Sequence, residues 1–287
     1  MFDEALADAA ELDKYMQANG IPKGPLHGLP ISVKEHIYLK DTPSSSGFIA
    51  WADDFATKDA LVVEIFRAAG AVFHVKTTNP QSLMVGQFLS VEIFFCWHVQ
   101  SLETESNLYG VTTNPHNTNL TPGGSSGGES ALLAMKGSPL GIGTDIGKCH
   151  SAMIEEVLLR YILGGSIRVP AAFCGIYGLK PSVGRLPHGG LAGTHAGMEN
   201  IIGAVGPMAR YAEDLSLFCK VCYIYLTPPI KANDSIVDVV RCGTLAGRTA
   251  SCRVALERGS DSPTTTSNWR NEEWWSCHTT PTNHTYT

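Results

Sequence analysis

The sequence predicts an α/β fold, because amphipathic helices and short buried strands alternate along it with glycines between them. Residues 2–16 carry apolar side chains at helical spacing up to Gly20, and residues 31–33 then form a short apolar strand. Residues 59–69 repeat the helical spacing, and residues 71–76 follow as a second apolar strand. Helix, glycine and buried strand in this order are typical of a sheet covered by helices.

The same alternation continues in the second half of the chain. A helix is predicted over residues 129–136, a strand over residues 139–144, and a helix with an acidic first turn over residues 212–221. Residues 85–102 interrupt the pattern, because they are apolar and aromatic without a clear period.

Composition excludes several classes of protein. The chain has 287 residues, of which 44% are hydrophobic and 17% charged, a balance typical of a globular protein. Its net charge of -6 gives no electrostatic reason to bind nucleic acid. We find no secretory signal, and no apolar run reaches the roughly 20 residues of a membrane span. The eight cysteines are scattered, so we expect reduced thiols and a cytoplasmic location.

The most informative stretch is TPGGSSGGES at residues 121–130. Two glycine pairs bracket two serines and lead directly into the predicted helix. Glycines permit a close approach of the backbone to a ligand, and the N–H groups at a helix start favour negative charge. The alternative is a flexible Gly/Ser linker. The shortness of the run and a second Gly-Gly-Ser at residues 164–166 favour a functional site.

A serine nucleophile needs a base. No histidine has a compelling context for this role: His27 lies in a Pro/Gly loop, His36 follows the first strand, and His188 and His195 lie in Gly-rich loops, which are contexts typical of structural or exposed residues. Lys34 ends the first strand. Its local context favours an ammonium group that extends to the surface. A buried lysine is the alternative, since lowering its pKa from about 10.4 to about 7–8 takes roughly 4 kcal/mol, which burial can supply.

Motifs for other chemistry are absent from the sequence. Residues 143–148 resemble a phosphate-binding loop, but Ile142 and Cys149 stand where that motif needs Gly and Ser or Thr. The sequence contains no HExxH, zinc-ligand spacing or GxGxxG. We therefore expect neither a metal nor a cofactor.

Several long motifs together resemble the amidase signature family of serine hydrolases, and among them the fungal acetamidase-like general amidases. They occur in the family's order and cover most of residues 1–220. These motifs are GPLHGLPISVKEHI (24–37), GAVFHVKTTNPQSLM (70–84), NLYGVTTNPHN (107–117), LTPGGSSGGESALLAMKGSPLGIGTDIG (120–147), GGSIRVPAAFCGIYGLKPSVGRLP (164–187) and GPMAR (206–210).

The resemblance implies a mixed central β-sheet flanked by helices and a Ser–cis-Ser–Lys triad. By motif position, Lys34 is the base, Ser125 is the bridging serine that follows a cis peptide, and Ser166 is the nucleophile. The implied reaction is hydrolysis of the C–N bond of small carboxylic acid amides, without metal or cofactor. The implied residues that surround the triad, as oxyanion donors or supporting groups, are Ser126, Asp145, Ile146, Gly147, Leu163, Gly164, Gly165 and Arg168.

The chain departs from the family pattern at two segments of foreign composition, near residues 85–101 and at residues 148–164. Ser125 and Ser166 are 41 residues apart, and without the 17 residues of the second segment the spacing is a family-like 24. This insertion separates Asp145 from Ser166 in sequence and leaves their proximity in space open. Backbone N–H groups of residues 163–165 then take the place of those of residues 146–147 as oxyanion donors.

We therefore expect an incomplete amidase signature domain over residues 1–230 and an aberrant, poorly ordered tail over residues 231–287, which lacks any sustained period. The family's usual N-terminal and C-terminal parts are missing from this pattern. Two alternatives to an active amidase stay open: a catalytically impaired amidase-like fragment, and the amidotransferase subunit that shares these motifs and works with tRNA. The acidic net charge disfavours the latter. A homodimer is an assembly that the sequence leaves open.

Overall fold

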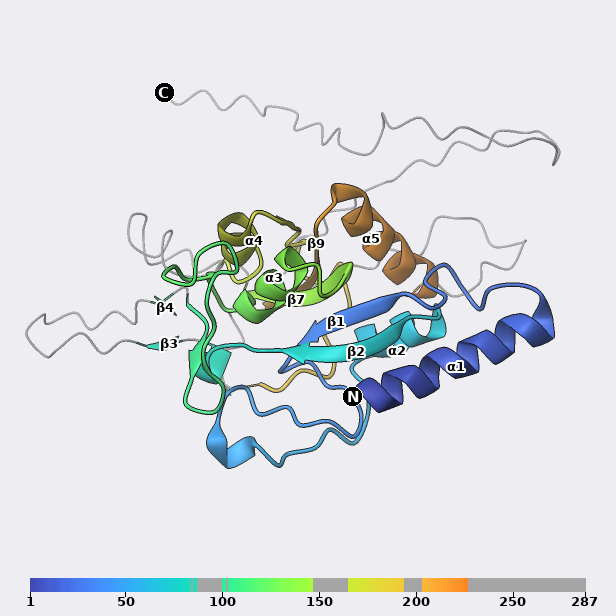
Figure 1. The fold of residues 1–287 in the computed structure, drawn as a ribbon, viewed down its shortest axis with the longest axis horizontal. Helices are drawn as coiled ribbons and strands as arrows, with labels where there is room; N and C mark the ends of the chain where they lie inside the picture. Colours follow the sequence, from blue (N-terminus) through green and yellow to red (C-terminus); the bar gives the residue numbers. More distant parts are fainter. Residues whose placement is uncertain (84, 87–99, 102, 147–164, 194–202, 227–287) are drawn as a thin grey trace, which may run out of the picture. The chain divides into compact units, whose positions relative to one another are not determined.

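The computed structural model describes residues 1–83, 85–86, 100–101, 103–146, 165–193 and 203–226 (Figure 1). Contacts between Cα atoms group residues 1–239 into one compact unit, to which all described residues belong. The predicted tail over residues 231–287 lies outside the described residues, as do the 148–164 segment and most of the 85–101 segment.

In the part of the chain that the structure describes, the central sheet has five strands in the order β2-β1-β7-β9-β8. β1 is parallel to both β2 and β7, whereas β9 is antiparallel to β7 and β8, so the expected mixed sheet is confirmed. The five strands are β1 (Pro30–Lys34), β2 (Val72–Thr77), β7 (Leu140–Ile146), β8 (Tyr177–Gly178) and β9 (Gly203–Ala209).

Within the described residues, five α-helices surround this sheet: α1 (Phe2–Asn19), α2 (Leu61–Ala68), α3 (Gly127–Ala134), α4 (Arg168–Cys174) and α5 (Ala212–Leu226). The smaller elements are the 3-10 turns η1 (Ile49–Trp51) and η2 (Gln81–Leu83) and the two-residue strand pairs β3 (Val85–Gly86) with β4 (Gln100–Ser101) and β5 (Glu105–Ser106) with β6 (Gly110–Val111). No helix in the described part of the chain is long and apolar enough to cross a membrane.

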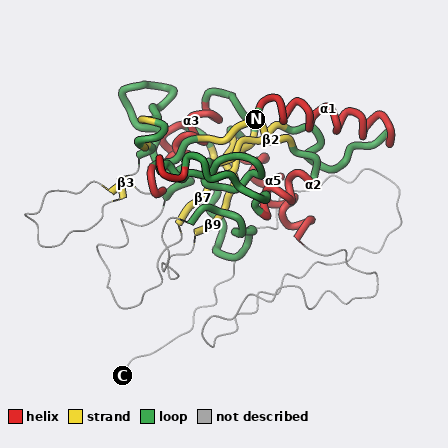
Figure 2. Tube along the Cα trace, turned by 90° about the horizontal axis from the view of Figure 1, so that it is seen from below, coloured by secondary structure: helices red, strands yellow, loops and turns green. Residues whose placement is uncertain are grey.

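Strand alternation gives β1 two different faces. Ile31 and Val33 join the main apolar core with side chains of α2 and α5. These two helices lie next to each other (Figure 2). Phe66 of α2 and Phe218 of α5 place their ring centroids 4.5 Å apart in this core. The intervening polar residues of β1 therefore point to the opposite face, which α3 covers.

Helix α3 begins at Gly127, two residues before the predicted start. Its first two residues have no room for a side chain, because an added Cβ at Gly127 would lie 2.1 Å from Thr104 Oγ1, and one at Gly128 would lie 2.4 Å from Thr78 Oγ1. The glycines thus let the start of α3 approach neighbouring backbone closely. This close approach positions the serine segment that precedes the helix.

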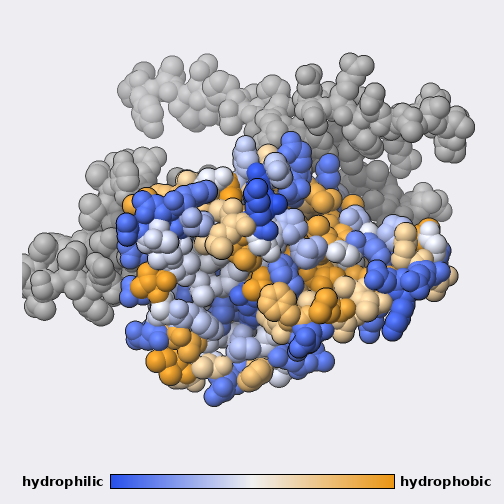
Figure 3. Space-filling view, viewed as in Figure 1, coloured by the Kyte–Doolittle hydropathy of each residue, from blue (hydrophilic) through white to orange (hydrophobic). Residues whose placement is uncertain are grey.

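Helix α1 is confirmed but buries less than its pattern indicates. It ends where Gly20 adopts the left-handed conformation with φ of 68°. Ala5 and Leu12 are buried against β2, whereas Phe2 and Leu6 are 67% and 70% exposed. Polar and apolar side chains are accordingly mixed on the face drawn in Figure 3.

Candidate active site

Lys34 lies at the carboxyl end of β1, and its side chain is fully buried. Its Nζ donates hydrogen bonds to Ser125 Oγ at 2.6 Å and to Thr144 Oγ1 at 3.0 Å. The local expectation of an ammonium at the surface is therefore wrong. The apolar strand carries the lysine inward because the serine segment before α3 covers its end.

The surroundings of Lys34 favour its neutral form. Burial lowers the pKa of Lys34 to about 7, and the negative charges of Asp145 and Glu129 oppose this effect. A lysine in this state can accept a proton at neutral pH. The group in direct contact with it on this side is the Ser125 hydroxyl.

The serine segment has an unusual backbone. The peptide bond between Gly124 and Ser125 is cis. An added Cβ at Gly124 would lie 2.1 Å from Glu103 O, so this residue has no space for a side chain. Ser125 is 4% exposed and presents its hydroxyl to the Lys34 ammonium.

Ser166 lies beside this segment although it is distant in sequence. The backbone N–H of Ser126 donates to the carbonyl oxygen of Ser166 at 3.0 Å, and the Ser126 hydroxyl donates to Thr144 O at 3.3 Å. Ser166 is 1% exposed. Its Oγ has no hydrogen-bond partner among the described residues, so the hydroxyl is free for another group.

Asp145 holds the chain on both sides of Ser166. Its carboxylate accepts hydrogen bonds from Gly165 N at 2.8 Å and from Ile167 N at 3.2 Å. The Arg168 guanidinium pairs with the same carboxylate, with Nε 3.0 Å from Oδ2. Separation in sequence therefore does not remove Asp145 from Ser166 in space.

The structure describes only two of the residues expected to supply oxyanion donors, Ile146 and Gly165. The N–H of Gly165 is directed to Asp145, so in this geometry it is not a donor for an oxyanion. Ile146 is the last residue of β7 and pairs with Gly203 of β9. Gly147, Leu163 and Gly164 lie outside the described residues.

Two residues near Lys34 were not singled out as site residues from the sequence. Thr144 accepts from Lys34, and its Oγ1 lies 3.3 Å from His36 Nε2. His36 is 2% exposed, and burial lowers its pKa well below the ordinary value, so it is neutral. The available signal was their position at the carboxyl ends of adjacent parallel strands, where α/β sheets place functional groups.

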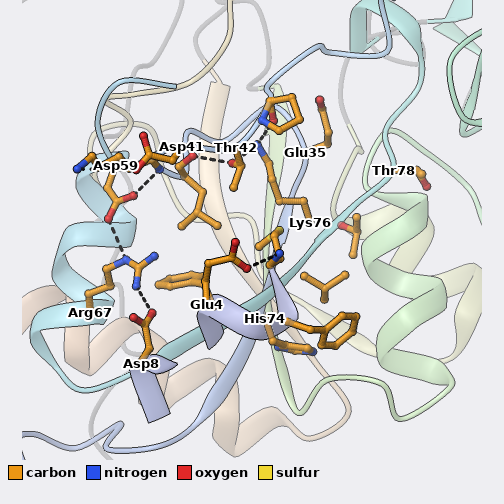
Figure 4. A pocket seen from close by; sticks show the side chains of 18 of the residues that line it. Glu4, Asp8, Glu35, Asp41, Thr42, Asp59, Arg67, His74, Lys76 and Thr78 are labelled. Atoms are coloured by element: carbon orange, nitrogen blue, oxygen red, sulfur yellow. Dashed lines mark hydrogen bonds and ion pairs between the residues drawn. The ribbon is translucent and has the colours of Figure 1, made fainter. Parts of the chain in front are cut away.

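A cavity of about 670 Å³ lies along β2, and its lining does not include Lys34, Ser125 or Ser166. The cations that line it have partners (Figure 4): Arg67 pairs with Asp8 and Asp59, and Lys76 donates to Pro43 O and Ser44 Oγ. Among the described residues, no three His, Cys, Asp or Glu side chains cluster so that they could hold a metal ion.

Comparison with known proteins decides the family. The profile of the Amidase family matches residues 1–149 and 163–250. The chain belongs to the Amidase family. The match leaves out residues 150–162, which lie within the predicted 148–164 insertion, while the boundaries of the predicted domain stay predictions.

Relatives of this amidase-family chain include two fungal acetamidases. It is 45% identical over 216 residues to the acetamidase of Aspergillus oryzae, which covers 75% of this chain and 34% of that protein. It is 43% identical over 218 residues to the acetamidase of Emericella nidulans, with coverage of 76% and 34%. The chain thus spans about a third of the length of the curated relatives that it matches.

Among solved structures, the fold is similar to that of a fatty acid amide hydrolase, with a TM-score of 0.63 and 36% identity over 76% of this chain and 32% of that one. It is also similar to the peptide amidase of Stenotrophomonas maltophilia, with a TM-score of 0.59 and 29% identity over 80% and 42% of the two chains.

Proposed function

We propose that this chain carries the nucleophile and the base of an amidase that hydrolyses the C–N bond of small carboxylic acid amides. Ser166 Oγ attacks the amide carbonyl carbon, and its proton passes through the Ser125 hydroxyl to Lys34 Nζ. The proton then returns to the leaving amine as the C–N bond breaks. Water cleaves the resulting ester at Ser166 and releases the carboxylic acid.

The observation that supports this proposal most is the state of Lys34. Its ammonium is buried, contacts two hydroxyls, and has no carboxylate within ion-pair distance in the described part of the chain. Burial brings the pKa of Lys34 to about 7, the range in which a general base is most effective. A purely structural lysine gains nothing from such a position, because burial of an unpaired charge costs free energy.

The surrounding residues support the nucleophile rather than react. Ser126 and Asp145 hold the backbone on either side of Ser166, and Arg168 balances the charge of Asp145. Because the Gly165 N–H binds Asp145, the oxyanion donors in this proposal are the backbone N–H groups of Leu163 and Gly164, which take the place of those of Ile146 and Gly147. Removal of one such donor typically costs about 10²–10³ in rate.

The alternative of a catalytically impaired fragment has support in the span of the chain, about a third of its curated relatives. Similarity to acetamidases and the net charge of -6 weigh against the tRNA-dependent amidotransferase subunit. The cytoplasmic location, the lack of nucleic-acid partners and the homodimer stay predictions from the sequence.

Labelling of the purified full chain with a fluorophosphonate probe tests the proposal. We expect a covalent adduct that Ser166→Ala abolishes, while the matched control Ser182→Ala, at an exposed serine, keeps it. Circular dichroism establishes that each sample is folded. A folded parent protein without labelling, or labelling that survives in Ser166→Ala, contradicts the proposal, and the former outcome supports the impaired fragment.

A further inference from the structure

Glu129 is a buried acid that the proposed reaction does not use. It lies in the first turn of α3 and is 0% exposed. Its carboxylate accepts hydrogen bonds from the hydroxyls of Ser32 on β1 and Thr77 on β2. An added Cβ at Gly141 on β7 would lie 1.9 Å from Glu129 Oε1. The carboxylate therefore fills a place between α3 and three adjacent strands.

The register of the sheet brings this carboxylate to Lys34. Ser32 and Lys34 are two residues apart on β1, so they share one face, with about 6.6 Å of strand between them. Thr77 is the direct partner of Lys34 across the β1–β2 ladder. Both hydroxyls that hold the Glu129 carboxylate are thus immediate neighbours of the proposed base.

The other charged and titratable groups around Lys34 either have partners of their own or are neutral. Asp145 on β7 is already paired with the guanidinium of Arg168. His36, after β1, is neutral because burial lowers its pKa. Lys76 on β2 directs its ammonium to residues 43–44. In the described part of the chain, Glu129 has no cation within ion-pair distance, and its charge and that of Lys34 each favour the ionised form of the other group.

We propose that Glu129 is a positioning residue whose carboxylate, held by Ser32 and Thr77, is the counter-charge that keeps the Lys34 ammonium stable beside Ser125. This inference rests on the proposed function of Lys34 as the base. This role also explains the hydroxyls of Ser32 and Thr77, because their hydrogen bonds stabilise the ionised form of Glu129, which burial disfavours.

The electrostatic effects agree in sign with this role. Burial raises the pKa of Glu129 to about 7, while the hydrogen bonds from Ser32 and Thr77 and the charge of Lys34 lower it. Against the effect of burial, the charge of Asp145 and, to a lesser extent, the charge of Glu129 raise the pKa of Lys34. Loss of the Glu129 charge therefore lowers the pKa of Lys34 and lets the base lose its proton at lower pH.

The test is the pH dependence of fluorophosphonate labelling in the full chain. In the parent protein we expect the labelling rate to rise with pH around a midpoint near 7, as Lys34 loses its proton. In Glu129→Gln, which keeps the shape of the side chain, the midpoint moves to lower pH by about 1 unit. In Thr77→Val, which removes one donor to the carboxylate, it moves in the same direction by less.

Glu35→Gln is the matched control, because Glu35 is also buried and next to Lys34 in sequence, but its carboxylate binds the backbone N–H groups of Ser45 and Ser46. We expect its midpoint to equal that of the parent. An unchanged midpoint in both Glu129→Gln and Thr77→Val overturns the inference. If Glu129→Gln does not fold, Thr77→Val decides alone.

A second readout separates this inference from the proposed function. The free energy of unfolding of the parent should start to rise with pH near pH 7, where folded Lys34 loses its proton. In Glu129→Gln this onset should move to lower pH, whether or not Ser166 reacts with the probe. Labelling that fails while the onset moves refutes the proposed function alone, and an onset that stays in place refutes the counter-charge.

Discussion

Replacement of Lys34 by Met should stabilise the fold at neutral pH while it abolishes labelling. Burial lowers the pKa of Lys34 from 10.5 to about 7. A change of one in pKa corresponds to about 1.4 kcal/mol, so the buried ammonium costs about 5 kcal/mol at pH values below 7. Met has a similar length and carries no charge, so this cost disappears in the variant.

The cost depends on pH in a defined direction. Below about pH 7, Lys34 is charged in both the folded and the unfolded state, and the full cost applies. Between about pH 7 and pH 10.5 the unfolded state binds one more proton, so the stability of the parent rises with pH. Lys34→Met lacks this rise, and the two proteins converge at high pH.

Three interactions lost in Lys34→Met reduce the stabilisation that comes from removing the buried charge. Ser125 and Thr144 each lose a hydrogen bond with Nζ, at about 1 kcal/mol apiece, and Glu129 loses its counter-charge and takes up a proton. The expected net stabilisation at pH 7 is about 1–3 kcal/mol. The double variant Lys34→Met with Glu129→Gln removes both buried charges and should be at least as stable as the single variant.

Urea unfolding at pH 7, 8 and 9 measures the effect. Lys14→Met, at an exposed position of α1, is the control and should change stability by less than about 0.5 kcal/mol at each pH. A Lys34→Met protein that is less stable than the parent at pH 7, or whose stability rises with pH as steeply as the parent's, would refute the reasoning.

Two further predictions concern residues that hold the backbone around Ser125 and Ser166. Asp145→Asn removes a buried carboxylate that holds two backbone N–H groups and the Arg168 guanidinium, so urea unfolding should show a loss of about 3–5 kcal/mol, and an unchanged stability would contradict the structure. Gly128→Ala places a Cβ within 2.5 Å of the Thr78 backbone, so thermal unfolding should show a loss of at least about 1–3 kcal/mol. Gly189→Ala, which has open space, is its control, and equal effects of the two would contradict the packing.

Elements with a clear period were predictable from the sequence. The strand predicted over residues 139–144 is observed as Leu140–Ile146, and the helix predicted over residues 59–69 as Leu61–Ala68. Strand β9 and helix α4 were not predicted, because Gly206 and Pro207 in β9 and Pro170 in α4 are typical of turns. In both elements, packing against β7 and α3 outweighs local preference.

The candidate site depended on motifs rather than on local pattern. Nothing near Lys34 in sequence indicates that its ammonium is buried, because the group that covers it, Ser125, comes 91 residues later. Glu129 likewise reads as an ordinary acid in a first helical turn, a position typical of exposed glutamates. Its burial follows from the contact of α3 with β1 and β2, which only the assembled sheet creates.

The hydrogen bonds of Asp145 affect how well this fold tolerates residues inserted before Ser166. Because Asp145 binds the N–H groups of Gly165 and Ile167, residues 145 and 165 lie next to each other although 19 residues separate them in the sequence. Once the ends of a flexible loop are fixed together, each doubling of its length costs only about 0.6 kcal/mol in closure entropy. This position is therefore a permissive insertion point, where the chain can gain or lose residues while the serine keeps its anchored backbone.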